Sequence, residues 1–328
     1  MGMLRNLTEA RLKEILRRQD PPTFGPGYEP AIKPTREEAP SRSRPAPVWV
    51  DKLGRDVSTL SWPERAVLAI ILYCCLKLVD LQEQRMLPFL PGAHPLHRHP
   101  LAAGMNLKPT RGTLQITSDL GFLRFHPVVN IAGNEDAPPT QAPGCWIGDY
   151  LVFIAGGNGP FCVNINVKST RSEFEFPQVD VNLNADPKRA AIREKARHET
   201  ERTVYSDFEI PTIEVAADEL PKILVANLLQ LMGWQKRQVT LSSDQVALAI
   251  DAFNEGLEQG ASPLDVIAAM ELSHGLPAYQ QKIVLHQAIF ARKLRVDLFE
   301  SHFFIDHPMR PETQDAVEVF AHWFRRWS

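Results

Sequence analysis

The feature that most limits the possible folds of this chain is a pair of apolar segments separated by a glycine-rich turn. The first runs from Tyr150 to Ile154 and the second from Phe161 to Lys168, and the sequence Ala-Gly-Gly-Asn-Gly-Pro joins them. Two strand-like runs bounded by such a turn predict a β-hairpin. We therefore expect a hairpin here.

Polar residues gather at one end of this hairpin. Asp149 stands just before the first strand, while Asn166 and Lys168 stand at the end of the second. Side chains two apart on a strand share a face, so Asn166 and Lys168 project together, and the turn brings them back toward Asp149. Oxygen ligands can hold Mg²⁺, and a lysine can steady charge at an attacked phosphate. The hairpin therefore predicts metal-dependent cleavage of a phosphodiester.

Length, charge and cysteine content limit the function further. The chain has 328 residues, of which 44% are hydrophobic, and this is enough for two domains. A protein that binds DNA tightly and alone is usually more basic than a chain with net charge −3, so we expect weak DNA affinity that depends on a partner. The four cysteines have no Cys-x-x-Cys spacing, which predicts neither a zinc site nor a disulfide framework. No secretory signal or membrane-length apolar run is visible, so we expect a cytoplasmic protein without membrane contact.

Changes in composition divide the chain into three parts. Residues 1–50 combine a helical pattern with a proline-rich stretch, which predicts a flexible arm, although docking of its helix is an open alternative. Residues 51–236 mix helical and strand patterns, as expected for the domain that carries the site. Residues 237–328 form a helical domain, which we expect to dock a partner.

The expected elements follow from apolar periodicity. In the middle domain we expect helices at 61–77, 187–205 and 218–230, a strand at 210–215, and short strands and turns at 79–90 and 112–129. In the last domain we expect helices at about 243–258, 263–273, 277–292 and 311–326, and a strand at 294–299. Three helices followed by a strand suggest a winged-helix module.

Several of these segments occur in an order that resembles one family. They are Ser61-Trp62-Pro63-Glu64-Arg65-Ala66, Val79-Asp80-Leu81-Gln82-Glu83-Gln84, Gly148-Asp149, Asn166-Val167-Lys168, Ile210-Pro211-Thr212 and Glu219-Leu220-Pro221. Over residues 55–235 the chain resembles the TnsA-type endonuclease subunit of heteromeric cut-and-paste transposases.

The resemblance implies an α/β chain with a restriction-endonuclease-like mixed sheet flanked by helices, followed by a helical C-terminal domain. It also implies Mg²⁺-dependent cleavage of the 5′ strands at transposon ends, with Mn²⁺ as a possible substitute. A partner transposase subunit then cuts and joins the 3′ strands, and a DNA-bound AAA+ ATPase recruits both. Such a protein acts in the bacterial cytoplasm, at the nucleoid.

The resemblance also assigns roles by position. It implies that Glu64 and Asp149 bind the metal, that the carbonyl of Val167 is a further ligand, and that Lys168 assists the attack of water. Asn166 stands where the family has glutamine, or glutamate in wider relatives. Because its side chain is one methylene shorter, we expect Asn166 to reach the metal only through a water or after a backbone shift, with slower cleavage.

Each of these residues also has an ordinary structural explanation. Asp149 could be a turn residue that enters a strand, and Lys168 could be an exposed lysine on a polar strand face. Ser61-x-x-Glu64 is a capping box, in which the glutamate returns to the N-cap amide. This last role does not exclude metal binding.

Other groups are assigned to binding or to the surface. The residues expected to contact DNA phosphates, unless they form a simple turn, are Ser169, Thr170 and Arg171. The residues expected to dock a partner protein are Arg292, Lys293 and Arg295. We expect a solvated helix face at His198, Glu199 and Glu201, and a loop without zinc at His94, His97 and His99. The aromatic and basic tail, residues 323–327, could either dock a partner or pack back on its own domain.

Two other functions stay open at this point. The chain could keep the fold without the chemistry and serve as a scaffold that binds DNA or recruits the ATPase. It could also be a stand-alone repair or restriction nuclease, which should cut DNA without partners.

Overall fold

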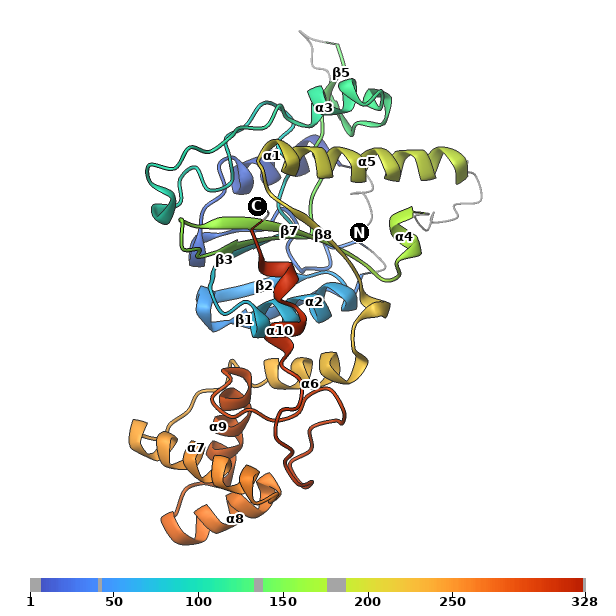
Figure 1. Ribbon diagram of the computed structural model, residues 1–328. Helices are drawn as coiled ribbons and strands as arrows, with labels where there is room; N and C mark the ends of the chain where they lie inside the picture. The colour runs from blue at the N-terminus through green and yellow to red at the C-terminus, as the bar shows by residue number, and fades with distance from the viewer. Residues whose placement is uncertain (1–6, 41–42, 133–137, 176–186, 327–328) are drawn as a thin grey trace.

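The computed structural model describes residues 7–40, 43–132, 138–175 and 187–326 (Figure 1). At its centre is a four-stranded sheet in the order β3-β6-β7-β8, with β3 (Leu78–Glu83), β6 (Tyr150–Ile154), β7 (Phe161–Lys168) and β8 (Thr212–Ala216). The first three strands pair antiparallel, and β7 and β8 pair parallel. The expected hairpin is therefore confirmed as β6 and β7, in which Tyr150 pairs with Ile165. The chain is a mixed α/β protein.

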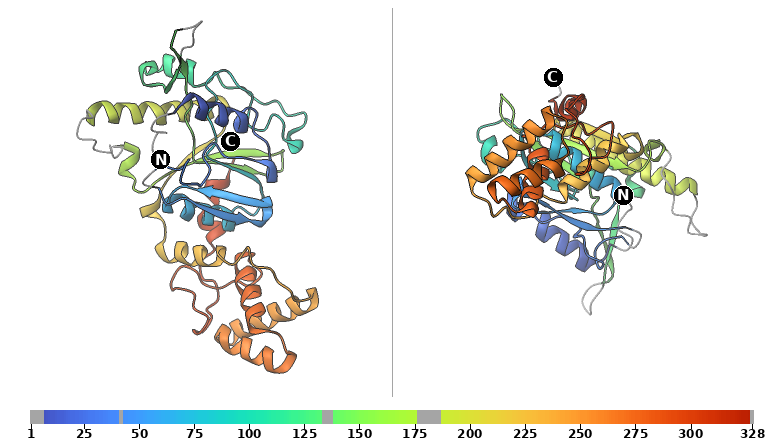
Figure 2. Two further views of the ribbon diagram at one scale, coloured as in Figure 1. Left: turned by 180° about the vertical axis from the view of Figure 1, so that it is seen from behind. Right: turned by 90° about the horizontal axis from the view of Figure 1, so that it is seen from below.

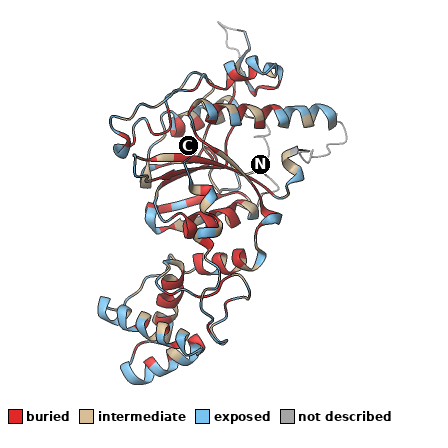
Figure 3. Ribbon diagram, viewed as in Figure 1, coloured by how far each residue is buried: buried red, intermediate tan, exposed pale blue. Residues whose placement is uncertain are grey.

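Helices cover both faces of this sheet. Helix α2 (Trp62–Cys74) has an unbroken buried run from Ala66 to Cys74, as expected for a helix that is apolar on all sides. It packs with Tyr150, Val152 and the other strand residues that point to its face. Helix α5 (Pro187–Asp207) covers the opposite face, where its last turns pack with Leu151 and Phe153. Alternate residues of β6 thus belong to the two cores on either side of the sheet. The strands of this sheet are mostly buried (Figure 3).

The N-terminal segment packs on the domain instead of forming a flexible arm. Helix α1 (Glu9–Gln19) buries Ile15, and the proline-rich stretch after it buries Ala31 and Ile32, all at 1% exposure or less. This prediction was wrong for the described residues because apolar side chains between the prolines enter a third core cluster. The proline-rich stretch contains η1 (Gly25–Gly27). The elements that follow it are β1 (Ala46–Val50), η2 (Asp51–Leu53) and β2 (Arg55–Thr59).

The region between β3 and β6 contains short elements. They are η3 (Pro100–Ala102), α3 (Thr113–Asp119), η4 (Leu123–Phe125), β4 (Val128–Ile131) and β5 (Thr140–Pro143). We expected short strands and turns at residues 112–129, but residues 113–119 of this segment form the helix α3 instead. His94 and His99 are turn residues, since their Nδ1 atoms accept the N–H groups of Leu96 and Leu101. Burial lowers the pKa of both histidines.

The C-terminal region forms a helical lobe beyond α2 (Figures 1 and 2). Three of its expected helices are confirmed as α7 (Ser243–Glu258), α8 (Pro263–His274) and α9 (Ala278–Phe290), and α6 (Lys222–Met232) precedes them. Two short elements, α4 (Ser172–Glu175) and η5 (Ala217–Glu219), belong to the sheet domain and follow β7 and β8. The expected strand at 294–299 is reduced to one bridge, between Val296 and Pro311. The expected helix at 311–326 is replaced by α10 (Ala316–Val319) and η6 (Ala321–Phe324), because Asp315 caps the chain and starts a helix late.

The C-terminal tail returns to the sheet. Trp323 is buried, and the guanidinium of Arg326 lies 5.7 Å from the centre of the Phe161 ring. Of the two alternatives for the tail, packing back is therefore the one that the structure has; residues 327–328 lie outside the described part. Within the described residues, no helix combines the length and the apolar character that crossing a membrane requires.

Candidate functional site

Three strand ends meet at one edge of the sheet and bring polar residues together. Tyr150 pairs with Glu83 on one side and with Ile165 on the other, so Asp149, one residue earlier, lies beside Gln84 and Asn166. The N–H of Gln84 donates to the carbonyl of Asp149 at 2.9 Å. The end of β3, the start of β6 and the end of β7 thus form a single polar cluster.

Asp149 is fixed against the second strand of the hairpin. Its side chain is buried, and its Oδ2 accepts the N–H of Val167 at 2.7 Å. Its Oδ1 is also buried and has no hydrogen-bond partner. A buried carboxylate oxygen without a partner is costly, so this atom is available for a ligand.

Glu64 is held at the start of α2 by several donors. Ser61 caps the helix, and its hydroxyl donates to Glu64 Oε1 at 2.9 Å. Glu64 Oε2 accepts the N–H of Leu60 at 2.8 Å and the amide of Gln84 at 3.0 Å. The glutamate therefore has the capping role that its spacing predicted. Its carboxylate, however, accepts the N–H of Leu60, the residue before the N-cap, and not the N–H of the N-cap residue Ser61.

Gln84 donates a hydrogen bond to Glu64 through its side chain and to Asp149 through its backbone, so the two carboxyl residues approach each other. Burial, and then the negative charge of Asp149, raise the pKa of Glu64 to about 7. Such a shift requires the two groups to lie within electrostatic range of each other in a poorly solvated place. A pair of this kind marks a candidate functional site.

Gln84 belongs to this site and Glu83 does not. Gln84 has φ 50°, in the left-handed region that glutamine rarely adopts, and its buried Oε1 has no partner. Strained backbone of this kind clusters at functional sites. Glu83 points to the α2 face, where it forms a buried ion pair with Arg55 at 2.8 Å.

Lys168 and Asn166 share one face of β7, as predicted, but neither is exposed. Lys168 is 6% exposed, and its Nζ lies 3.1 Å from Oε1 of Glu194 on α5. The alternative of a solvated lysine is therefore wrong. Asn166 is buried, and its Oδ1 accepts the amide of Asn164 at 3.3 Å. Its oxygen is thus hydrogen-bonded within the strand.

Helix α5 supplies residues that the sequence interpretation missed. His198 and Glu201, expected on a solvated face, are buried, as is Arg197. Arg197 lies 3.1 Å from Glu194 and 3.6 Å from Glu201. The missed signal is the spacing of Glu194, Arg197, Glu201, Val204 and Phe208, which recur every three or four residues and mark one helix face.

Glu201 is the most buried of these charges. It is 0% exposed, both of its carboxylate oxygens lack a hydrogen-bond partner, and a Cβ on Gly148 would lie 2.9 Å from its Oε1. Burial raises the pKa of Glu201 to about 7, with Arg197 opposing the shift and Asp149 adding to it. The glycine before Asp149 therefore makes room for this carboxylate.

The residues expected to bind DNA form a turn with internal partners. Arg171 donates to Glu219 at 2.9 Å and to the carbonyl of Glu214 at 3.3 Å. The hydroxyls of Thr170 and Ser172 are 3.0 Å apart, and Ser169 is exposed. These contacts favour the simple-turn alternative.

The residues expected to dock a partner are mostly paired within the chain. Arg292 and Arg295 each lie 2.8 Å from Asp315, and both also contact Glu312. The folded-back C-terminal segment thus supplies acidic partners for both arginines, and the docking role stays a prediction. Lys293 is exposed.

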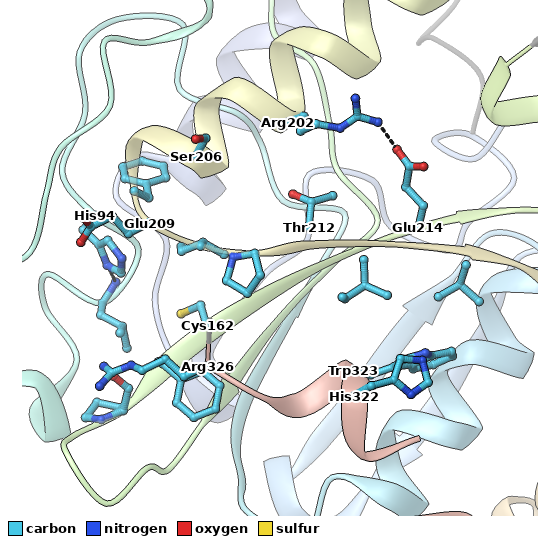
Figure 4. A pocket seen from close by; sticks show the side chains of 18 of the residues that line it. His94, Cys162, Arg202, Ser206, Glu209, Thr212, Glu214, His322, Trp323 and Arg326 are labelled. Atoms are coloured by element: carbon cyan, nitrogen blue, oxygen red, sulfur yellow. Dashed lines mark hydrogen bonds and ion pairs between the residues drawn. The ribbon is translucent and has the colours of Figure 1, made fainter. Parts of the chain in front are cut away.

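A large cavity lies elsewhere. It has a volume of about 1250 Å³ and follows β8, the edge strand, with Thr212, Arg202 and Trp323 among its lining residues (Figure 4). Neither Glu64, Asp149 nor Lys168 lines it. The buried polar cluster at the ends of β3, β6 and β7 is therefore the candidate functional site.

Ligand geometry and charge decide whether the cluster can hold a divalent cation. The described residues hold no group of three or more histidine, cysteine, aspartate or glutamate side chains placed to bind a metal. The cluster, however, contains four carboxylates and two cations, which leaves two negative charges when all are ionised: Glu64, Asp149, Glu194 and Glu201 against Lys168 and Arg197. Together with the unpartnered Asp149 Oδ1, this charge fits one divalent cation near Glu64 and Asp149.

Comparisons with models of protein families and with curated proteins find no match for this chain.

Proposed function

We propose that this chain is a divalent-metal-dependent DNA endonuclease, the subunit of a heteromeric transposase that cuts the 5′ strands at transposon ends. One observation carries the proposal. Glu64 and Asp149 come from different elements, are both buried and both accept a hydrogen bond from Gln84, and Lys168 ends the strand whose Val167 N–H binds Asp149. The mixed sheet between α2 and α5, and the ordered motifs of the sequence, support a restriction-endonuclease-like fold.

The metal in this proposal is Mg²⁺, with Mn²⁺ as a substitute. When bound, it would supply an activated water and neutralise charge on the phosphate. Glu64 and Asp149 would hold it, with the carbonyl of Val167 as a further oxygen ligand.

The chain's own residues prepare this site. Ser61, Leu60 and Gln84 orient the carboxylate of Glu64, and the N–H of Val167 orients that of Asp149. The ammonium of Lys168 would stabilise the negative charge that develops on the attacked phosphate.

The proposed partners are transposon-end DNA, a transposase subunit that cuts and joins the 3′ strands, and an AAA+ ATPase. The net charge of −3 supports dependence on such partners, because phosphate neutralisation by this chain alone is limited.

Nicking of end-containing DNA in the presence of the transposase tests the proposal. We expect the Asp149→Ala variant to lose nicking, and the Asp251→Ala variant, which removes an exposed carboxylate of α7, to retain it. Equal activity of wild type and Asp149→Ala would end the proposal.

One observation favours a second candidate, a scaffold that binds DNA or recruits the ATPase without cutting. Glu64, Asp149 and Lys168 are all at least 94% buried, and the ammonium of Lys168 already pairs with the carboxylate of Glu194. Calorimetric titration separates the two functions, because a scaffold should bind neither Mg²⁺ nor Mn²⁺ at millimolar concentration.

A further inference from the structure

Three side-chain nitrogens approach one carboxylate oxygen on α5. Glu194 Oε1 lies 3.1 Å from Nζ of Lys168, 3.1 Å from Nη1 of Arg197 and 3.3 Å from Nε2 of His198. The side chains of Lys168, Arg197 and His198 are at most 7% exposed, and that of Glu194 is 16% exposed. The amine that the proposed reaction needs therefore has a buried anionic partner, contributed by another element.

The same helix face reaches the other half of the site. Residues three and four apart on a helix lie side by side, so Glu194, Arg197 and Glu201 form one stripe. Arg197 contacts both glutamates, and Glu201 packs against Gly148, the residue before Asp149. The stripe thus runs from the lysine of β7 to the aspartate that precedes β6.

We infer that Glu194 is a positioning residue for Lys168, and that Arg197 and Glu201 tie this contact to the Asp149 side of the site. The inference rests on the proposed nuclease function. A lysine side chain has many rotamers, and holding its ammonium at one point requires a fixed partner. Glu194 supplies that partner, and Arg197 fixes Glu194 in turn.

A labelling experiment tests the contact without any DNA. The full-length protein is treated with an amine-acetylating reagent, and the rate of Lys168 modification is measured by mass spectrometry. We expect at least about tenfold faster labelling in Glu194→Gln than in wild type, because the ammonium loses its anionic partner. Glu199→Gln is the matched control, since Glu199 lies on the outer side of α5, 3.6 Å from Lys195.

A kinetic experiment tests the role. With end-containing DNA and the transposase, we expect Glu194→Gln to lower kcat by about 10- to 100-fold, the range typical when a supporting partner of a site residue is lost. KM for DNA should change less than about threefold, because in this proposal the transposase supplies much of the DNA binding and the side chain of Glu194 is only 16% exposed. Glu194→Asp keeps the negative charge and should therefore retain part of the kcat that Glu194→Gln loses. If Glu194 had only a structural role, the fall in kcat in each variant would instead parallel the fall in its melting temperature.

The outcomes separate the inference from the function on which it rests. Wild-type nicking together with unchanged kcat in Glu194→Gln overturns the positioning role and leaves the nuclease proposal intact. Unchanged labelling of Lys168 in Glu194→Gln overturns the contact itself. A wild-type protein that never nicks refutes the proposed function, even where the labelling confirms the contact.

Discussion

The raised pKa of Glu201 predicts how the stability of this protein depends on pH. The pKa lies at about 7 in the folded chain, against an ordinary value of 4.5, so the native state holds the proton more tightly than the unfolded state. The resulting stabilisation is complete below pH 4.5 and is lost as the pH rises through 7. Glu201→Gln cannot lose this proton, so the variant should gain stability relative to wild type over the same range.

The magnitude follows from the two pKa values. Between pH 6 and pH 8, one carboxyl with these values loses about 1 kcal/mol of stabilisation. For a domain of about 150–250 residues this corresponds to a relative change of roughly 2–4 °C in Tm. The groups that surround Glu201 are Arg197, Lys168, Asp149 and Glu194, and all of them remain in the variant.

The quantity that tests this prediction is the free energy of unfolding of Glu201→Gln minus that of the wild type at each pH. Burial lowers the pKa of several histidines, and each of these shifts makes the folded protein more stable as the pH rises. In the curve of the wild type taken by itself, this trend opposes the effect of the Glu201 carboxyl. Subtracting the wild-type curve from the curve of Glu201→Gln removes this shared contribution. Glu199→Gln serves as the control for removing a carboxylate from the same helix.

The assay is chemical unfolding at pH 6, 7 and 8 in buffer of constant ionic strength with a chelator of divalent metals. We expect the free energy of unfolding of Glu201→Gln minus that of wild type to increase steadily over this range. A difference that stays constant, or that falls with pH, would refute the claim that this carboxyl is destabilised by burial.

Three further outcomes are expected. Gly148→Ala should lower stability by about 1–3 kcal/mol, because its Cβ would lie 2.9 Å from Glu201 Oε1; thermal melting beside Gly157→Ala, which has open space, checks this. Asn166→Gln should bind Mg²⁺ at least a few times more tightly in calorimetry, since the longer side chain extends beyond the bond from Asn164; weaker binding would contradict a supporting role at the metal. Mg²⁺ binding at pH 7 should release protons from the two buried glutamates, and a binding heat that is the same in buffers of different ionisation enthalpy would argue against this.

Local patterns in the sequence were enough for several parts of the fold. The hairpin followed from two apolar runs and a glycine-rich turn, and the start of α2 followed from Ser61 and Glu64. The approach of Asp149 to the end of β7 followed from the register that such a hairpin imposes. These features depend on residues close in sequence, so periodicity and capping rules are sufficient to predict them.

Contacts between distant segments were decided only by the tertiary structure. The charged face of α5 looked solvated, but it covers the sheet, where Arg197 and Glu201 compensate each other and lie against Gly148. Arg292 and Arg295 stand out in the sequence as basic residues, but only the folded-back C-terminal segment shows that Asp315 lies beside them. The physical reason is the same in both cases: a charged side chain can be buried where an opposite charge meets it, and that charge comes from wherever the packed chain places it.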